Sequence, residues 1–267
     1  MKNMAMITGA SEGLGKSLAL ECAKRKMDLF LVSLPDSGLA SLCNFIEDNF
    51  HVSVWFFETD LTSEPNCQEV CQYVIQQNLP INILINNAGV GGNFNFEKQD
   101  FMLFSKMIRL NILATTLITH ELIHRLAQME QSYILNVSSM AIFFDAPFKQ
   151  VYGATKSFTY YFSKSLSFEL KSKNISVSVV CPGGINSNPR MTRVNNKCNM
   201  FTKFSVMSPE LVAQQALDGM LDKKKVIIPG RVVNLYFALT KLLPGRLKTF
   251  LTEYTTKNLL KFQNATQ

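Results

Sequence analysis

The 267-residue sequence predicts an α/β fold, a single doubly wound parallel sheet of about seven strands with helices on both faces. Seven short apolar, β-branched runs predict the strands, at residues 4–8, 29–33, 52–57, 83–86, 134–137, 177–181 and 226–228. Helical patterns of about ten or more residues fill the intervals, and this alternation is typical of a parallel sheet covered on both sides. Right-handed crossovers then produce a Rossmann-type doubly wound fold.

Composition indicates one compact domain over residues 1–267. Hydrophobic residues make up 47% of the chain, there are nine prolines, and no internal repeat or low-complexity run is visible. The six cysteines are scattered, which fits a reducing compartment better than a disulfide framework, so we expect a cytoplasmic protein. The longest late apolar run, residues 232–243, is too short to span a bilayer, so we do not expect an integral membrane protein.

The formal net charge of +7 is compatible with a nucleic acid, an acidic membrane surface or an anionic substrate. No nucleic-acid-binding motif accompanies the charge, so we expect no nucleic-acid partner. Residues 231–260 interleave apolar and basic side chains, which predicts a C-terminal helical extension that covers a pocket or makes peripheral contact with an anionic membrane.

The stretch ITGASEGLGKS near the N-terminus matches parts of two phosphate-binding loops. A triphosphate loop needs a glycine five places before Gly15, and Ala10 stands there. The alternative is a glycine turn, Gly9, Gly13 and Gly15, between the first strand and a helix, whose free N–H groups favour a pyrophosphate. Its spacing also departs from G-x-G-x-x-G, so neither pattern decides alone.

In a doubly wound sheet the ligand lies beyond the carboxyl ends of the strands. Polar or glycine-rich stretches follow the fourth, fifth and sixth predicted strands: residues 86–89 (NNAG), Ser138-Ser139 and Pro182-Gly183. Because parallel strands end at one edge of the sheet, we expect these stretches to form one site with the glycine turn.

A helix predicted to begin near Val151 carries Tyr152 and Lys156, and a spacing of four places both side chains on one helical face. An adjacent ammonium favours the phenolate, so we expect the pKa of Tyr152 to be lowered toward neutrality, where it can exchange a proton with a substrate. Ser139 could hydrogen-bond the same substrate oxygen.

TGASEGLG, NNAG, Asn111, Ser139, Tyr152-x-x-x-Lys156 and PGG, taken in this order, resemble the short-chain dehydrogenase/reductase family over about residues 4–228. The resemblance implies an NAD(P)(H)-dependent oxidoreductase that interconverts a ketone and a secondary alcohol. It also implies that the N-terminal turn holds a nicotinamide dinucleotide rather than a triphosphate.

The resemblance assigns a role to each of four catalytic residues. Tyr152 is the proton donor in reduction or the base in oxidation, and Lys156 lowers its pKa and holds the nicotinamide ribose. Ser139 orients the carbonyl, while Asn111 fixes a water that connects Lys156 to solvent.

The resemblance implies no metal ligand. It implies cofactor contacts for a larger set of residues: Thr8, Gly9, Ser11, Gly13, Leu14, Gly15, Ser33, Asp60, Leu61, Asn87, Ala88, Gly89, Tyr152, Lys156, Pro182, Gly183, Ile185 and Ser187. Ser187 stands where the family usually has a threonine. Ser33 and Leu34 stand at the end of the second strand, where an acidic residue would select NAD. The missing carboxylate favours NADP(H), whereas Glu12 and Asp36 favour the alternative, NAD(H).

Two other functions remain as alternatives. His120-Glu121-Leu122-Ile123-His124 matches the helical zinc-hydrolase signature H-E-x-x-H, but the only other histidine is His51, on a distant segment, and an acidic third ligand would be needed. The second alternative function is a non-catalytic dinucleotide-binding regulator on the same fold. This alternative would be favoured if the catalytic residues were replaced by other residue types.

Residues 186–207 carry methionine and phenylalanine among polar side chains, which predicts a substrate lid over an apolar molecule. The alternative is that these side chains only pack the segment onto the domain. With residues 140–144 (MAIFF), the lid favours a hydrophobic ketone such as a 3-ketoacyl compound. The resemblance further implies a homodimer or homotetramer that pairs through helices at residues 105–129 and 151–172.

Overall fold

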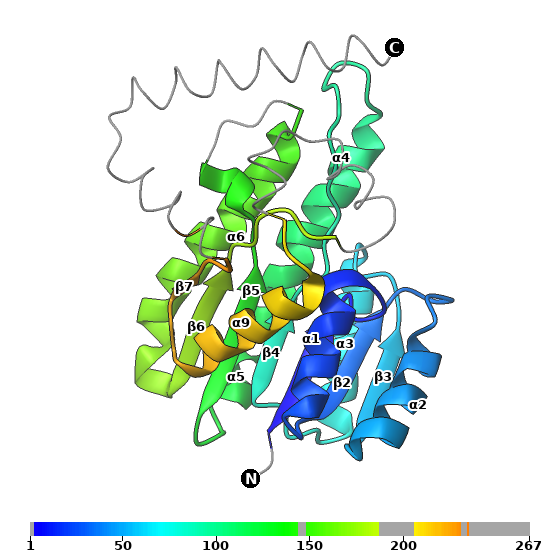
Figure 1. Ribbon diagram of the computed structural model, residues 1–267, viewed down its shortest axis with the longest axis vertical. Coiled ribbons are helices and arrows are strands. Elements are labelled where there is room, and N and C mark those ends of the chain that lie inside the picture. Colours follow the sequence, from blue (N-terminus) through cyan, green and yellow to red (C-terminus); the bar gives the residue numbers. More distant parts are fainter. Residues whose placement is uncertain (1–2, 144–147, 187–205, 231–233, 235–267) are drawn as a thin grey trace.

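The computed structural model describes residues 3–143, 148–186, 206–230 and 234. Seven parallel strands form one sheet in the order β3-β2-β1-β4-β5-β6-β7 (Figure 1). The strands are β1 (Met4–Thr8), β2 (Asp28–Ser33), β3 (Val54–Glu58), β4 (Ile83–Asn86), β5 (Ser132–Val137), β6 (Ile175–Val180) and β7 (Val226–Ile227). The predicted doubly wound α/β fold is therefore confirmed, with the chain reversing direction across the sheet between β1 and β4.

All seven predicted strand regions form strands, and their starting points differ by up to two residues. β3 starts at Val54 instead of residue 52, because the Ser53 amide donates to the Asp28 carboxylate (2.8 Å) before the strand begins. β5 and β6 start earlier than predicted, since Ser132 already pairs with Ile175. Hydrophobic pattern alone misses a polar residue that enters the ladder.

Helices cover both faces of the sheet. One face carries α1 (Gly13–Lys24), α2 (Leu39–Phe50) and α9 (Pro209–Leu221), and Figure 1 shows α1 and α9 side by side. The other carries α3 (Glu64–Gln76), the π-helical turn η1 (Arg109–Ala114), α5 (Thr115–Leu126) and α6 (Gln150–Glu169), and α4 (Phe101–Ile108) packs against η1 and α6. Two 3₁₀ turns, η2 (Met140–Phe143) and η3 (Leu170–Lys173), complete the described helices.

The central strands are apolar on both faces, which is what places them inside two layers of helices. In β2, Leu29 and Leu31 pack with α1, α2 and α9, while Phe30 and Val32 pack with α3 and α5. All four side chains are fully buried. This double burial stiffens the sheet whose carboxyl edge carries the site.

Helices α4, η1 and α5 run on without a break over Phe101–Leu126, 26 residues. Within the described residues this is one helix that is long and apolar enough to cross a membrane, judged by length and composition only. One of its faces packs on the sheet through Ile118, Leu122 and Leu126. The core helix of a domain meets the same criterion.

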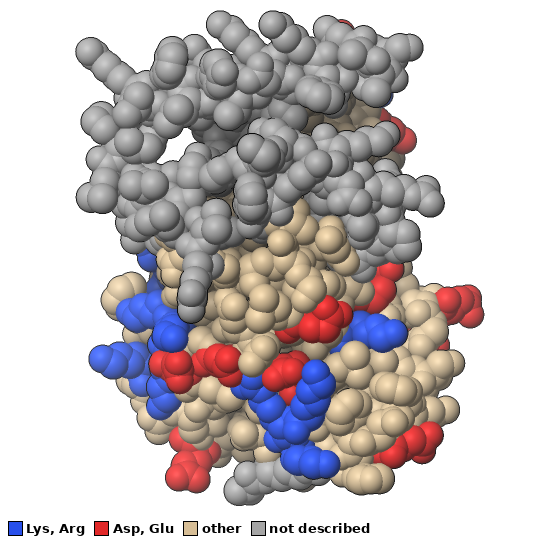
Figure 2. Space-filling view, viewed as in Figure 1, with Lys and Arg blue, Asp and Glu red and all other residues tan. Residues whose placement is uncertain are grey.

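The predicted lid, residues 186–207, and the predicted extension, residues 231–260, fall mostly outside the described residues. Of the lid, Asn186, Val206 and Met207 are described, and a parallel bridge joins Ile185 to Met207. On the described part of the face in Figure 2, acidic and basic side chains are interleaved.

Candidate active site

The glycine turn after β1 leads the chain directly into α1. Gly9 and Gly13 adopt φ angles of +66° and +55°, which favour glycine. Gly15 lies so close to the Gly9 carbonyl and the Asn87 side chain that no Cβ fits between them. Glu12, the N-cap residue, makes no capping bond with its side chain. The N-terminal N–H groups of this 12-residue helix therefore have no side-chain cap and follow a turn whose glycines allow close backbone approach, which fits a dinucleotide pyrophosphate.

Thr8 and Asn87, both predicted to contact the cofactor, brace the turn against β4. The Thr8 hydroxyl oxygen accepts from the backbone N–H groups of Asn87 and Ala88, each at 3.1 Å. The Asn87 amide donates to the carbonyl groups of Thr8 and Gly9, each at 3.0 Å. The Thr8 hydroxyl oxygen and the Asn87 side-chain nitrogen therefore position the turn and are already paired within the protein.

At the end of β2 the hydroxyl groups of Ser33 and Ser11 lie 2.6 Å apart, in hydrogen-bond contact. Leu34 follows and is 49% exposed, so no carboxylate directly follows the strand. After β3, Asp60 accepts from the Thr62 amide (2.9 Å), and Leu61 is buried. All of these predicted cofactor residues lie at the carboxyl edge of the sheet.

The catalytic residues meet where β5 ends and α6 begins. Ser139 follows β5, and its hydroxyl group accepts from the Ala141 amide at 3.2 Å and lies close enough to Tyr152 to affect the pKa of the phenol. α6 begins at Gln150, so Tyr152 and Lys156 lie one turn apart in its first turns. The structure thus brings together Ser139 and Tyr152, as the sequence predicted.

Lys156 is 6% exposed, and its ammonium group donates to the Val137 carbonyl at 2.8 Å. Burial lowers the pKa of Lys156 to about 8. Burial raises the pKa of Tyr152, and the nearby Ser139 hydroxyl group opposes that change. The expected lowering of the Tyr152 pKa is therefore wrong for the cofactor-free protein, because the loss of water around the phenol outweighs its polar contacts.

Asn111 lies in η1 and is 1% exposed. Its side-chain oxygen accepts from the Val90 amide (2.9 Å), and its side-chain nitrogen donates to the Val90 carbonyl (3.0 Å) and the Thr155 hydroxyl (3.0 Å). The side chain is thus occupied within the protein. The water expected at Asn111 stays a prediction.

Sequence reasoning missed Thr155 and Gly91 at this site, and it assigned no contact to Ser138. Thr155 contacts Asn111, and Ser138 donates to the Lys156 carbonyl at 2.8 Å. Gly91 lies against the Tyr152 ring, since a Cβ there would stand 2.5 Å from its Cε2 atom. Thr155 could have been found, because Thr155, Thr159, Ser163 and Ser167 form a polar stripe at a spacing of four on α6.

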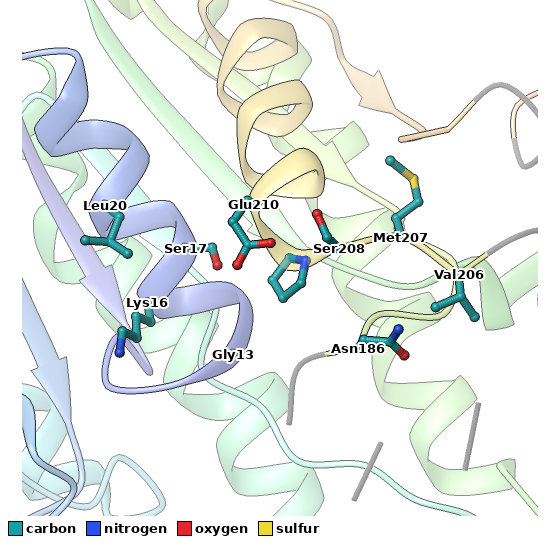
Figure 3. Close-up of a pocket in the computed structure, with 10 residues that line it drawn as sticks. Gly13, Lys16, Ser17, Leu20, Asn186, Val206, Met207, Ser208 and Glu210 are labelled. Carbon is teal, nitrogen blue, oxygen red and sulfur yellow. The ribbon is translucent and has the colours of Figure 1, made fainter. Parts of the chain in front are cut away.

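Pro182, Gly183 and Ile185 follow β6, and the Pro182 carbonyl accepts from the Met140 amide at 2.9 Å. Ser187 lies outside the described residues. A cavity of about 530 Å³ lies between the starts of α1 and α9. Figure 3 shows the residues that line it. Gly13 of the glycine turn lines it on one side, and Asn186 and Met207 line it on the other.

The H-E-x-x-H stretch lies in α5 with His120 and His124 exposed. His120 lies 3.4 Å from the Glu121 carboxylate. Among the described residues no group of three His, Cys, Asp or Glu side chains is placed to hold a metal ion. His51 ends α2, on the other face of the sheet.

Comparison with known proteins assigns the family. The sequence model described as short chain dehydrogenase matches residues 3–199. The chain belongs to this family. A curated relative, the very-long-chain 3-oxoacyl-CoA reductase of Macaca fascicularis, is 32% identical over 186 residues, 67% of this chain and 58% of that protein. This short-chain dehydrogenase thus spans 58% of the length of that relative.

Two solved structures are similar over most of this short-chain dehydrogenase. The bulky-bulky ketone specific alcohol dehydrogenase from Comamonas testosteroni is 29% identical, with a TM-score of 0.77 over 90% of this chain and 91% of that chain. A short-chain dehydrogenase from Sphingobium yanoikuyae in complex with NADPH is 28% identical, with a TM-score of 0.77 over 90% and 93% of the two chains.

Proposed function

We propose that this protein is an NAD(P)(H)-dependent oxidoreductase that interconverts a ketone and a secondary alcohol. The observation that carries the proposal is that Ser139 lies beside Tyr152, which precedes the buried Lys156 by one helical turn. A bound nicotinamide cofactor would supply or accept the hydride. Family membership and the intact catalytic residues favour this function over a cofactor-binding regulator or a zinc hydrolase.

In the direction of reduction, Tyr152 donates a proton to the carbonyl oxygen while Ser139 holds that oxygen by a hydrogen bond. With a nicotinamide cofactor bound, Lys156 would hold the nicotinamide ribose and would place its ammonium group near the phenolate. An ammonium turned toward the phenol would lower the Tyr152 pKa, which burial alone raises.

We propose a hydrophobic ketone, such as a 3-ketoacyl compound, as the substrate. Met140, Ile142, Phe143 and Tyr160 form an apolar cluster next to Ser139. The printed names of the similar proteins, a 3-oxoacyl-CoA reductase and a bulky-ketone dehydrogenase, support the same class.

The test is a series of 3-oxoacyl thioesters of increasing chain length with NADPH, in which kcat/KM should rise with length. A sugar ketone of similar reactivity is the counter-substrate. A flat or falling series, with better turnover of the sugar, would overturn the proposed substrate class and leave the reaction type standing.

We propose NADP(H) as the preferred cofactor. Ser33 ends β2 with a hydroxyl group where a carboxylate would repel a 2′-phosphate, and a similar short-chain dehydrogenase was solved in complex with NADPH. The ratio of kcat/KM for NADPH to that for NADH should exceed one and should fall below one in Ser33→Asp. A wild-type ratio below one would contradict the proposal.

We propose a homodimer or homotetramer that pairs through the helix over Phe101–Leu126 and through α6. Tyr161 and Phe168 on α6 are 74% and 68% exposed, and Leu113 on η1 is 39% exposed. Light scattering at micromolar concentration should give an oligomer, and the double variant Tyr161→Asp, Phe168→Asp should dissociate it. A monomeric wild-type protein would refute this assembly.

We also propose a cytoplasmic location and peripheral contact with an anionic membrane. The five described cysteines are buried free thiols, which is compatible with a reducing compartment. Flotation of the purified protein with phosphatidylserine vesicles tests the membrane contact, with neutral vesicles as the control.

A further inference from the structure

One hydroxyl group joins the two sides of the catalytic centre. Thr155 lies between the catalytic residues of α6 and is 1% exposed. Its oxygen accepts from the Asn111 side-chain nitrogen at 3.0 Å and donates its own proton to the Tyr152 carbonyl at 2.8 Å. The bond to Asn111 is buried, and the bond to the Tyr152 carbonyl is partly buried.

The bonds continue beyond Asn111 to the segment that follows β4. Asn111 holds Val90 by both its amide and its carbonyl. Val90 stands between two glycines that touch the catalytic pair. A Cβ on Gly89 would lie 3.2 Å from the Lys156 Nζ atom, and one on Gly91 would lie 2.5 Å from the Tyr152 ring.

These contacts form a closed path, which we call the Thr155 bridge: Tyr152 carbonyl, Thr155 hydroxyl, Asn111 amide and Val90 backbone. The path starts at the backbone carbonyl of Tyr152 and ends at the backbone of Val90, next to Gly91, which lies against the Tyr152 ring. It therefore sets the distance between α6 and the glycine segment, and with it the orientation of the Tyr152 ring.

We propose that Thr155 is a positioning residue that holds Tyr152 and Lys156 in their reactive geometry by fixing Asn111 and Val90. This inference rests on the proposed oxidoreductase function. Loss of the hydroxyl leaves a buried N–H donor of Asn111 without a partner, and an unpaired donor favours rotation of the side chain toward another acceptor. Val90 and the glycines on both sides of it then move relative to Tyr152.

Thr159 supplies a matched control on the same helical face. It is 2% exposed, and its hydroxyl donates to the Thr155 carbonyl at 3.1 Å, a local bond within α6. Thr159→Val removes a buried hydroxyl group of the same kind, with the same change of shape. It leaves Asn111 and Val90 in contact with each other and with Thr155.

The first experiment compares Thr155→Val, Thr155→Ser and Thr159→Val in NADPH-dependent ketone reduction. We expect Thr155→Val to lower kcat by about 10- to 100-fold, as misplacement of a reacting group does, with the NADPH dissociation constant changed by less than about threefold. Thr155→Ser keeps the hydroxyl and should restore most of kcat. Thr159→Val should stay within about threefold of wild type.

The second experiment needs no turnover. The Val90 amide proton is bonded to Asn111, so its hydrogen exchange reports on the bridge. Exchange at Val90 should be faster in Thr155→Val than in wild type and unchanged in Thr159→Val.

Each failure has a separate meaning. Unchanged exchange at Val90 in Thr155→Val would refute the bridge whether or not the protein is active. Equal losses of kcat in Thr155→Val and Thr159→Val, or in the Ser and Val variants, would refute a specific positioning role. Absence of turnover in the wild type with every ketone would refute the proposed function instead.

Discussion

Lys156 carries a charge that the fold buries, so the stability of the cofactor-free protein should depend on this side chain and on pH. Burial lowers its pKa from 10.5 to about 8. At about 1.4 kcal/mol per pH unit, this difference corresponds to about 3 kcal/mol of unfavourable free energy at neutral pH, where the folded protein still binds the proton. Lys156→Met removes the charge and keeps a side chain of similar length.

The replacement also loses the hydrogen bond to the Val137 carbonyl, a net loss of about 1 kcal/mol. We therefore expect Lys156→Met to raise the free energy of unfolding by about 2 kcal/mol near pH 7. Because the folded-state pKa is the lower one, the unfolded chain keeps the proton between pH 8 and 10.5 after the folded protein has released it. Wild-type stability rises with pH in that range relative to the variant, and the gain of the variant should fall by about 2 kcal/mol between about pH 7 and 9.5.

Urea unfolding followed by circular dichroism without nucleotide measures both quantities. Lys171→Met, in the exposed turn η3, is the control for removal of a lysine charge. Two results would refute the reasoning: Lys156→Met is less stable than wild type near pH 7, or it is more stable by the same amount at both pH values. Either result would mean that Lys156 is not a buried charge with a lowered pKa.

Three further predictions follow from the site. In Gly91→Ala the new Cβ would stand 2.5 Å from the Tyr152 ring, so kcat should fall at least about tenfold. Gly153→Ala is the control, because there is open space around its new Cβ, and its kcat should not change. Equal effects of the two substitutions on kcat would contradict the close packing of Gly91 on Tyr152. Tyr152→Phe should lower kcat by about 10²- to 10⁴-fold with an unchanged NADPH dissociation constant, measured by fluorescence titration, and comparable turnover would exclude Tyr152 as the proton donor. The described cysteines are buried, and burial raises the pKa of Cys22, for example, to about 12. A Cys198→Ser protein should therefore show no thiol that reacts quickly with Ellman's reagent near pH 8 until urea is added. Fast labelling of the folded variant would contradict the burial of these thiols.

The sequence predicted the sheet well because its strands are apolar on both faces, and this pattern does not depend on contacts far along the chain. It also predicted the meeting of Ser139 with Tyr152, since parallel strands end at one edge and a spacing of four puts Tyr152 and Lys156 on one face. It did not predict the direction of the Tyr152 pKa. That direction follows from burial by neighbours outside the motif, which a residue spacing does not encode.

The Thr155 contact was missed for a related reason, because Asn111 and Thr155 are 44 residues apart and a threonine in a helix has many ordinary roles. The same holds for Thr8 and Asn87. A motif places both near a dinucleotide, but only the structure reveals that their polar atoms are paired with each other's backbone.

Buried polar contacts extend below the site and explain how a domain with two apolar layers holds one reactive geometry. The Asn86 amide donates to the Asn136 oxygen at 2.8 Å and to the Thr119 hydroxyl at 3.0 Å, and the Asn136 amide donates to the Ser163 hydroxyl at 2.8 Å. These bonds join β4 and β5 to α5 and α6.

Each of these buried bonds adds only about 1 kcal/mol of net stability, so their main effect is not the stability of the fold. Apolar side chains pack acceptably at several small displacements of a helix, whereas a hydrogen bond between two buried amides tolerates few. Because Ser163 lies on the same stripe of α6 as Thr155, a chain of directed bonds fixes the height of α6 on the sheet, and with it the position of Tyr152 over the end of β5.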